Sequence, residues 1–176
     1  LKSTGVKTFI IHARKAMLGK FTPKQNLNIP PLKYEMVYKL KKDFKDLEII
    51  INGGITSTDD IKNHLNKVDG VMIGRSVYHS PYILADIEKE IFKNENILTR
   101  EEIIQELIPY VKNETKKGTR LNQIMRHTLG LFHGQTGSSF WKRYLSENMC
   151  DRDADVKKID HIMDKVKLAP QVRSAG

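Results

Sequence analysis

The sequence predicts an α/β fold with parallel strands, followed by a small all-α domain. Three short apolar runs in the first half of the chain, at 8–11, 48–51 and 71–73, are bounded by polar residues and separated by segments of helical periodicity. Two of these runs are followed closely by glycine. After residue 98 the apolar residues recur at helical spacing, which is typical of a helical bundle.

The first predicted strand, Thr8–Ile11, runs directly into His12, Arg14 and Lys15, so a histidine and two cations lie at its carboxyl end. Taken alone, His12 is more often an ordinary core or loop histidine than a ligand-binding one. Residues 17–31 contain three prolines and predict a loop of about fifteen residues, a length that is typical of functional loops.

A helix is expected after this loop, with Pro30 and Pro31 at its start. Its apolar residues recur at helical spacing and predict one buried stripe, made of Leu32, Met36, Val37, Leu40 and Phe44.

The second predicted strand, Glu48–Ile51, is followed by Asn52, Gly53 and Gly54. Two glycines at the carboxyl tip of a strand allow positive φ angles and leave no Cβ in the way, so backbone N–H groups can approach an anion closely. On its own, a Gly-Gly pair is as often a tight turn before a helix. That helix is expected to be capped within Thr56–Thr58 and to bury Ile61 and Leu65 on one face.

The third predicted strand, Val71–Ile73, repeats this arrangement, because Gly74, Arg75 and Ser76 follow it. In a (β/α)8 barrel the phosphate site is frequently formed by the loops after strands seven and eight. Two glycine-ended strands in succession, the second with an arginine, therefore predict a phosphate site of this kind.

Such a barrel needs roughly 250 residues, whereas this chain has 176. We therefore expect residues 1–92 to be the C-terminal portion of a (β/α)8 TIM barrel, with the three runs as its strands six to eight, within a longer protein. A last barrel helix is expected to be capped at Ser80-Pro81 and to carry an apolar face made of Ile83, Leu84, Ile87 and Ile91.

Residues 93–98 are polar and predict a linker, and residues 99–176 predict a helical domain. Thr99 and Glu102 form a capping-box pattern at the start of a helix that is expected to bend at Pro109 and stop at Gly118. Three further helices are expected, at Leu121–Phe132, Ser139–Met149 and Val156–Val166.

Cations and aromatic residues flank the glycine-rich segment 130–137 of this domain, a combination that could hold phosphates and stack a base. Without further information the plainer interpretation is favoured, in which Trp141 and Leu145 are core residues and the cations are solvated. The flanking residues are Arg120, Arg126 and His127 before the segment, and Trp141, Lys142, Arg143 and Tyr144 after it.

The composition favours a polyanionic partner, because thirty Lys and Arg stand against twenty-one Asp and Glu, with a pI near 9.5. No apolar stretch is long enough to span a membrane, and no metal-ligand spacing is present. The single cysteine, Cys150, excludes an internal disulfide and is expected to be an inert thiol in a reducing, cytoplasmic location.

Taken together, the motifs of this chain resemble those of the A-type tRNA-dihydrouridine synthases over nearly its whole length. No single motif is specific, but their order and spacing are. They lie at His12–Ala16, Thr22–Asn26, Ile29–Glu35, Ile51–Ile55, Asp69–Arg75, Tyr78–Tyr82, Leu129–Gln135 and Trp141–Glu147.

The resemblance implies an FMN-dependent enzyme of the U20/U20a type, which reduces a D-loop uridine of tRNA to dihydrouridine with NADPH as the reductant, and a monomeric full-length protein. It implies that His12 contacts the flavin and that five further residues bind it, namely Asn52, Gly53, Gly54, Gly74 and Arg75. It also implies tRNA contacts at Lys24 and Lys142.

Three features depart from the family. Leu27 and Ser139 stand at tRNA-contact positions where the family commonly has arginine. The family's catalytic cysteine belongs to an earlier part of the protein, and Cys150 does not match it, so this chain is expected to be inactive alone. Two alternatives stay open, a flavin or phosphate-binding barrel enzyme that acts on a small molecule, and a non-catalytic RNA-binding fragment.

Overall fold

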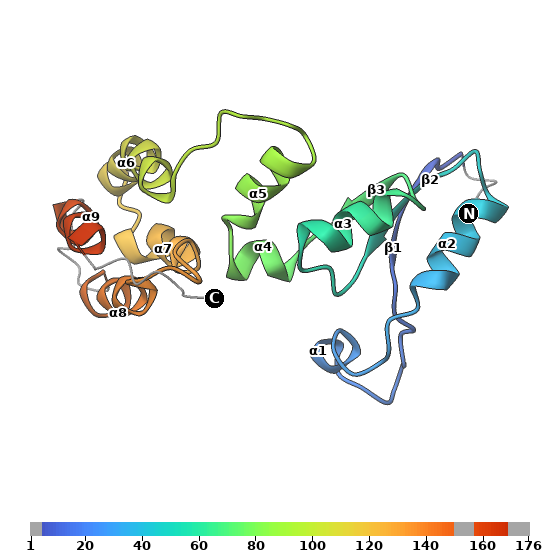
Figure 1. The fold of residues 1–176 in the computed structure, drawn as a ribbon. Helices are drawn as coiled ribbons and strands as arrows, with labels where there is room; N and C mark the ends of the chain where they lie inside the picture. The colour runs from blue at the N-terminus through green and yellow to red at the C-terminus, as the bar shows by residue number, and fades with distance from the viewer. Residues whose placement is uncertain (1–4, 150–156, 169–176) are drawn as a thin grey trace. The chain divides into compact units, whose positions relative to one another are not determined.

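The structure is a computed structural model, which describes residues 5–149 and 157–168 (Figure 1). Cys150 lies outside the described residues. The chain divides into two compact units, Leu1–Ser76 and Val77–Gly176. The fold is a mixed α/β arrangement, with a small parallel sheet in the first unit and helices in the second.

The sheet of the first unit contains β1 (Thr8–His12), β2 (Glu48–Asn52) and β3 (Gly70–Met72) in that order. Both strand pairs are parallel, with Ile10 opposite Ile50 and Ile50 opposite Gly70. The three predicted strands are confirmed, although β3 begins and ends one residue earlier than expected.

Helices α2 (Tyr34–Asp43) and α3 (Thr58–Leu65) make the two crossovers between these strands. The central strand is the most buried, since Ile49 and Ile51 are 3% and 0% exposed. The expected cap of α3 is confirmed, because the Ser57 hydroxyl accepts a hydrogen bond from the Asp60 N–H in a capping box.

Two details of these helices differ from the prediction. Helix α2 begins at Tyr34 and not at Pro30-Pro31, because Leu32 pairs with Arg14 in an antiparallel bridge that keeps its backbone extended. The predicted stripe is wrong in part. Val37 and Tyr38 are the buried residues of α2, and His64 is buried on α3; four residues predicted to be buried are exposed, namely Met36, Leu40, Phe44 and Leu65.

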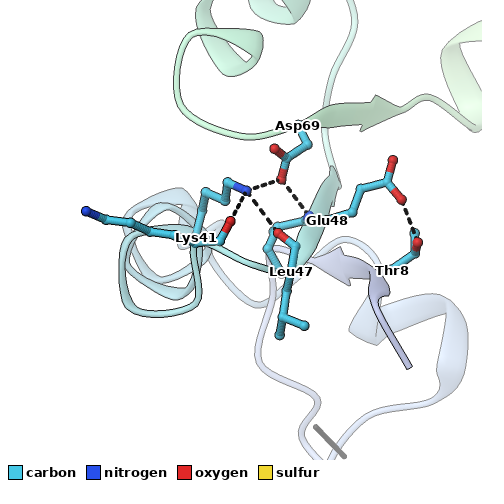
Figure 2. A network of polar contacts seen from close by, with 7 residues as sticks. Thr8, Lys41, Leu47, Glu48 and Asp69 are labelled. Carbon is cyan, nitrogen blue, oxygen red and sulfur yellow. Dashed lines mark hydrogen bonds and ion pairs between the residues drawn. The ribbon is translucent and has the colours of Figure 1, made fainter. Parts of the chain in front are cut away.

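A polar network holds the amino ends of the strands together (Figure 2). The Asp69 carboxylate, just before β3, accepts hydrogen bonds from the Ile49 N–H and from Lys41 Nζ, each at 2.8 Å. Lys41 Nζ also donates to the Leu47 carbonyl at 2.9 Å. The network therefore joins α2, β2 and β3 at the edge of the sheet opposite to the predicted site.

The second unit begins with helical segments around a turn. Helix α4 (Arg75–His79) was not predicted and starts at the boundary of the units. Helix α5 (Ile83–Glu90) begins after Tyr82 without a side-chain cap, so the expected cap at Ser80-Pro81 is wrong. Residues 93–98 contain neither helix nor strand.

Four further α-helices follow in the described part of this unit: α6 (Arg100–Lys116), α7 (Leu121–Met125), α8 (Ser138–Asn148) and α9 (Lys157–Leu168). The Thr99 capping box is confirmed, and α6 ends just before Gly118. The helix expected at Leu121–Phe132 is shorter than predicted, because α7 passes into the 3-10 helix η2 (Arg126–Thr128) and then into turns.

The core of the second unit is built around Trp141, which is fully buried and donates from Nε1 to the Thr128 carbonyl at 3.0 Å. Its ring lies 4.8 Å from that of Phe132. The interpretation of Trp141 and Leu145 as core residues is therefore confirmed. Their buried neighbours are Ile104, Val111, Leu121, Met125, Leu131, Met149, Ile159, Ile162 and Met163.

Candidate functional site

The candidate site lies at the carboxyl edge of the sheet, where parallel strands bring their last residues together. His12 and Asn52 are paired in register at the ends of β1 and β2. The Ala13 N–H donates to the Asn52 carbonyl at 2.7 Å, and Asn52 Nδ2 lies 3.0 Å from Met72 Sδ at the end of β3. Three strand ends are thus linked directly.

The turn after β2 requires glycine at both positions. Gly53 and Gly54 have φ angles of +122° and +70°, which side chains rarely adopt. A Cβ on Gly53 would lie 3.1 Å from Leu32 Cδ2, and one on Gly54 would lie 2.5 Å from Leu32 Cδ1, at the end of a side chain that can move. The positive φ angles are therefore what disfavours a side chain at both positions.

The second glycine segment lies next to this turn. The Ser76 hydroxyl, in the first turn of α4, donates to the Ile55 carbonyl at 2.7 Å, which joins the segment after β3 to the segment after β2. Gly74 is exposed, and no atom lies within 4 Å of the place where its Cβ would be. The space beside Gly74 is open to a ligand.

Arg75 is exposed and is turned toward the loop of residues 17–31, which we call the α1 loop because it contains α1 (Pro23–Asn26). Its guanidinium donates to Asn28 Oδ1 and, at 3.4 Å, to the Leu27 carbonyl. Sequence reasoning gave no role to Asn28, since no periodicity connects two residues that are 47 positions apart.

Arg14 also contacts the α1 loop. Its guanidinium donates to the Pro30 carbonyl and, at 3.5 Å, to the Asn28 carbonyl. Arg14 Nε is buried and has no hydrogen-bond partner in the part of the chain that the structure describes. A buried donor without an acceptor is costly.

The electrostatics of the edge suit an anion. Burial of part of its ring lowers the pKa of His12 below the ordinary value, and the positive charges of Arg14 and Arg75 lower it further. The ring is therefore neutral at neutral pH, with one nitrogen that donates and one that accepts. An anion with several acceptor oxygens, such as a phosphate, fits two cations and glycine N–H groups in this arrangement.

The residues predicted to contact tRNA lie on two helices, one in each unit. Lys24 is exposed on α1, and Leu27, at the end of α1, is 43% exposed. Ser139 and Lys142 are exposed on α8 and are three positions apart, so they lie on one face of that helix. The structure therefore leaves these four positions accessible.

Comparison of the sequence with known proteins identifies the family of this chain. Residues 1–167 match the sequence model of the dihydrouridine synthases. The chain belongs to the dihydrouridine synthase family. The resemblance noted in the sequence is therefore confirmed at the level of the family.

Several members of the family with the printed name tRNA-dihydrouridine(20/20a) synthase are similar to this chain. The one from Haemophilus ducreyi is 46% identical over 156 residues, which are 88% of this chain and 48% of that relative. The Synechocystis one is 50% identical over 147 residues, 83% of this chain and 44% of the relative. The one from Vibrio cholerae is 42% identical over 163 residues, which are 92% of this chain and 50% of that relative.

The chain thus spans about half the length of the curated relatives it matches. Within residues 5–149 and 157–168 no helix is long and apolar enough to cross a membrane. Over the same residues there is no group of His, Cys, Asp or Glu side chains that could hold a metal ion.

Proposed function

We propose that this chain is the C-terminal portion of an FMN-dependent tRNA-dihydrouridine synthase, with β1, β2 and β3 as strands six to eight of its barrel. The carboxyl edge of the sheet would bind the flavin and its phosphate, and the α1 loop and α8 would contact tRNA. The observation that carries the proposal is the pair of positive-φ glycines beside the open space at Gly74 and the exposed Arg75.

Each residue of the edge has a role in this proposal. The N–H groups of Gly53 and Gly54 and the guanidinium of Arg75 neutralise the phosphate. Neutral His12 and the Asn52 amide orient the rest of the flavin by hydrogen bonds. FMN, reduced by NADPH, supplies the hydride for the C5–C6 double bond of the uridine.

The names of the relatives support tRNA as the substrate and a uridine of the 20/20a type as the target. Chemistry on a base in a folded RNA requires that the base leave its stack and enter the pocket. Lys24 and Lys142 would hold the tRNA through its phosphates while this happens. The proton donor would be a cysteine in a preceding part of the protein, so residues 1–176 alone would be inactive.

Arg75→Ala and Lys142→Ala test the division of roles in the complete polypeptide that carries this chain. We expect Arg75→Ala to weaken FMN binding by about 10- to 100-fold, since it removes charge-assisted hydrogen bonds to the phosphate. Lys142→Ala should weaken tRNA binding and lower the slope of log affinity against log salt by about one. Flavin fluorescence measures the first affinity and a gel shift the second.

Two matched variants control for indirect effects. Asn28→Ala removes the side-chain partner of Arg75 in the loop, keeps its bond to the Leu27 carbonyl and leaves the guanidinium in place, so FMN should still bind. Lys112→Ala removes an equal charge from an exposed position on α6, so it should leave the tRNA affinity nearly unchanged. Equal losses of both ligands in Arg75→Ala and Lys142→Ala would refute the assignment.

A further inference from the structure

The carbonyl of Gly53 has a side-chain partner that sequence reasoning did not single out. The Tyr34 hydroxyl, at the first residue of α2, donates to it at 2.8 Å. Because the peptide bond between Gly53 and Gly54 is trans and planar, the Gly54 N–H must point away from that carbonyl. A hydrogen bond that fixes the carbonyl therefore also fixes the direction of the N–H.

The Gly54 N–H is a free donor, because it makes no hydrogen bond to any residue in the described part of the chain. Glycine φ angles are soft, so a Gly-Gly turn can rotate this peptide unit at little cost unless something holds it. The Tyr34 hydrogen bond opposes that rotation. It leaves the N–H aimed to the side of the peptide opposite to α2, where a ligand can accept from it.

Tyr34 is itself held in place from two directions. Its ring contacts His64 edge to face, with ring centroids 4.5 Å apart. His64 is 5% exposed, and its Nδ1 lies 2.7 Å from the Tyr38 hydroxyl. The Lys33 N–H donates to the Ala13 carbonyl at 2.7 Å, which fixes the chain just before Tyr34 to the end of β1.

Burial raises the pKa of the Tyr34 hydroxyl above its ordinary value, and the nearby Asp60 carboxylate raises it further. The hydroxyl therefore keeps its proton at physiological pH and remains a donor.

From this geometry we infer that Tyr34 is the positioning residue of the phosphate site, which holds the Gly53–Gly54 peptide so that its N–H faces the ligand phosphate. The inference rests on the function proposed above. It assigns to the side chain no contact with the ligand itself, and it predicts a defect that is confined to recognition of the phosphate.

Tyr34→Phe tests this role in the complete polypeptide, with FMN and riboflavin as two probes that differ by the phosphate. The loss of one oriented hydrogen bond should raise the Kd of FMN about 3- to 10-fold and leave the Kd of riboflavin unchanged. At saturating FMN, the phosphorus NMR resonance of the bound phosphate should also shift. An equal loss of both flavins, or an unshifted resonance with an unchanged FMN Kd, would overturn the inference.

Tyr38→Phe is the matched control, because it removes a hydroxyl that is bonded to the same His64 but does not contact the glycine turn. It should lower the melting temperature and leave the ratio of the FMN and riboflavin affinities as in the wild type. A ratio that falls as far in Tyr38→Phe as in Tyr34→Phe would make the effect a general loss of packing. A wild-type protein that binds both flavins equally would instead refute the proposed phosphate site.

Discussion

Asp69 joins strand ends by accepting two hydrogen bonds, one from a backbone N–H and one from a lysine. The Ile49 N–H, and after it the Lys41 ammonium, hold the pKa of the Asp69 carboxyl below its ordinary value. A carboxyl whose pKa is lower in the folded than in the unfolded state stabilises the fold above its unfolded pKa, and this contribution is lost as the pH falls through the folded pKa.

We therefore expect Asp69→Asn to reduce the free energy of unfolding at neutral pH and to reduce it less in acid, where Asp69 is protonated in the wild type too. Urea unfolding of both proteins from pH about 7 down to about 3 measures the difference. Asp59→Asn is the control, because that side chain is 87% exposed and its pair with Lys62 is long, at 3.9 Å. A difference between wild type and Asp69→Asn that does not shrink in acid would contradict this account.

Single residues also show what the sequence could and could not predict. The sequence predicted that positions 53 and 54 require glycine and that Trp141 is buried. Both predictions depend only on residues that are near in sequence. Tyr34 and Asn28 could not be identified from spacing, since each acts on a residue of a distant segment, Gly53 and Arg75 respectively. Such contacts depend on the tertiary structure and produce no periodic pattern in the sequence.

At the scale of elements, one glycine sets how closely two segments of the second unit approach. A Cβ on Gly130 would lie 2.1 Å from the His79 carbonyl oxygen and 3.1 Å from Pro81 Cδ. The first of these atoms is backbone, so no side-chain rotation can relieve the contact. The turn between α4 and α5 therefore packs directly on the backbone that follows η2.

Gly130→Ala should accordingly destabilise the protein by about 3 kcal/mol, at the upper end of the usual cost of overpacking. Gly118→Ala is the comparison, because Gly118 has open space around it but a φ of +94°, and conformational strain alone costs about 1 kcal/mol. Chemical denaturation of the two variants gives both values. Equal values would show that the contact with His79 is not restrictive.

Elements with a local signal were predicted well. The three strands have continuous apolar runs, and the caps at Ser57 and Thr99 follow from side chains within one turn. A boundary that was misplaced is set by a distant contact. The start of α2 depends on the bridge between Arg14 and Leu32.

On the scale of the whole molecule, the sheet leaves apolar surface uncovered. Strand β1 pairs with β2 alone among the described residues, and Ile10 at its centre is 57% exposed. An unpaired strand edge with apolar side chains is prone to associate with other chains.

Residues 1–176 produced alone should therefore associate with increasing concentration, whereas the complete polypeptide of the proposed enzyme should stay monomeric. Sedimentation velocity at several concentrations measures this difference. Ile10→Thr, which keeps the β-branched shape but lowers the apolar area, should reduce the association. A 176-residue chain that is monomeric at every concentration would show that the exposed edge is harmless.

The hydrogen bonds that join Arg75 to Leu27 and Asn28 couple the proposed phosphate site to the α1 loop. If the Arg75 guanidinium rotates toward a phosphate, its hydrogen bonds to the loop change. A ligand that fixes the loop in turn changes the free energy of this side-chain rotation. If the proposed function is right, reciprocity requires that tRNA change the Kd of FMN by the same factor as FMN changes the Kd of tRNA. Under the proposed function, Asn28→Ala should bring this shared factor toward one, whichever of the two ligands is titrated.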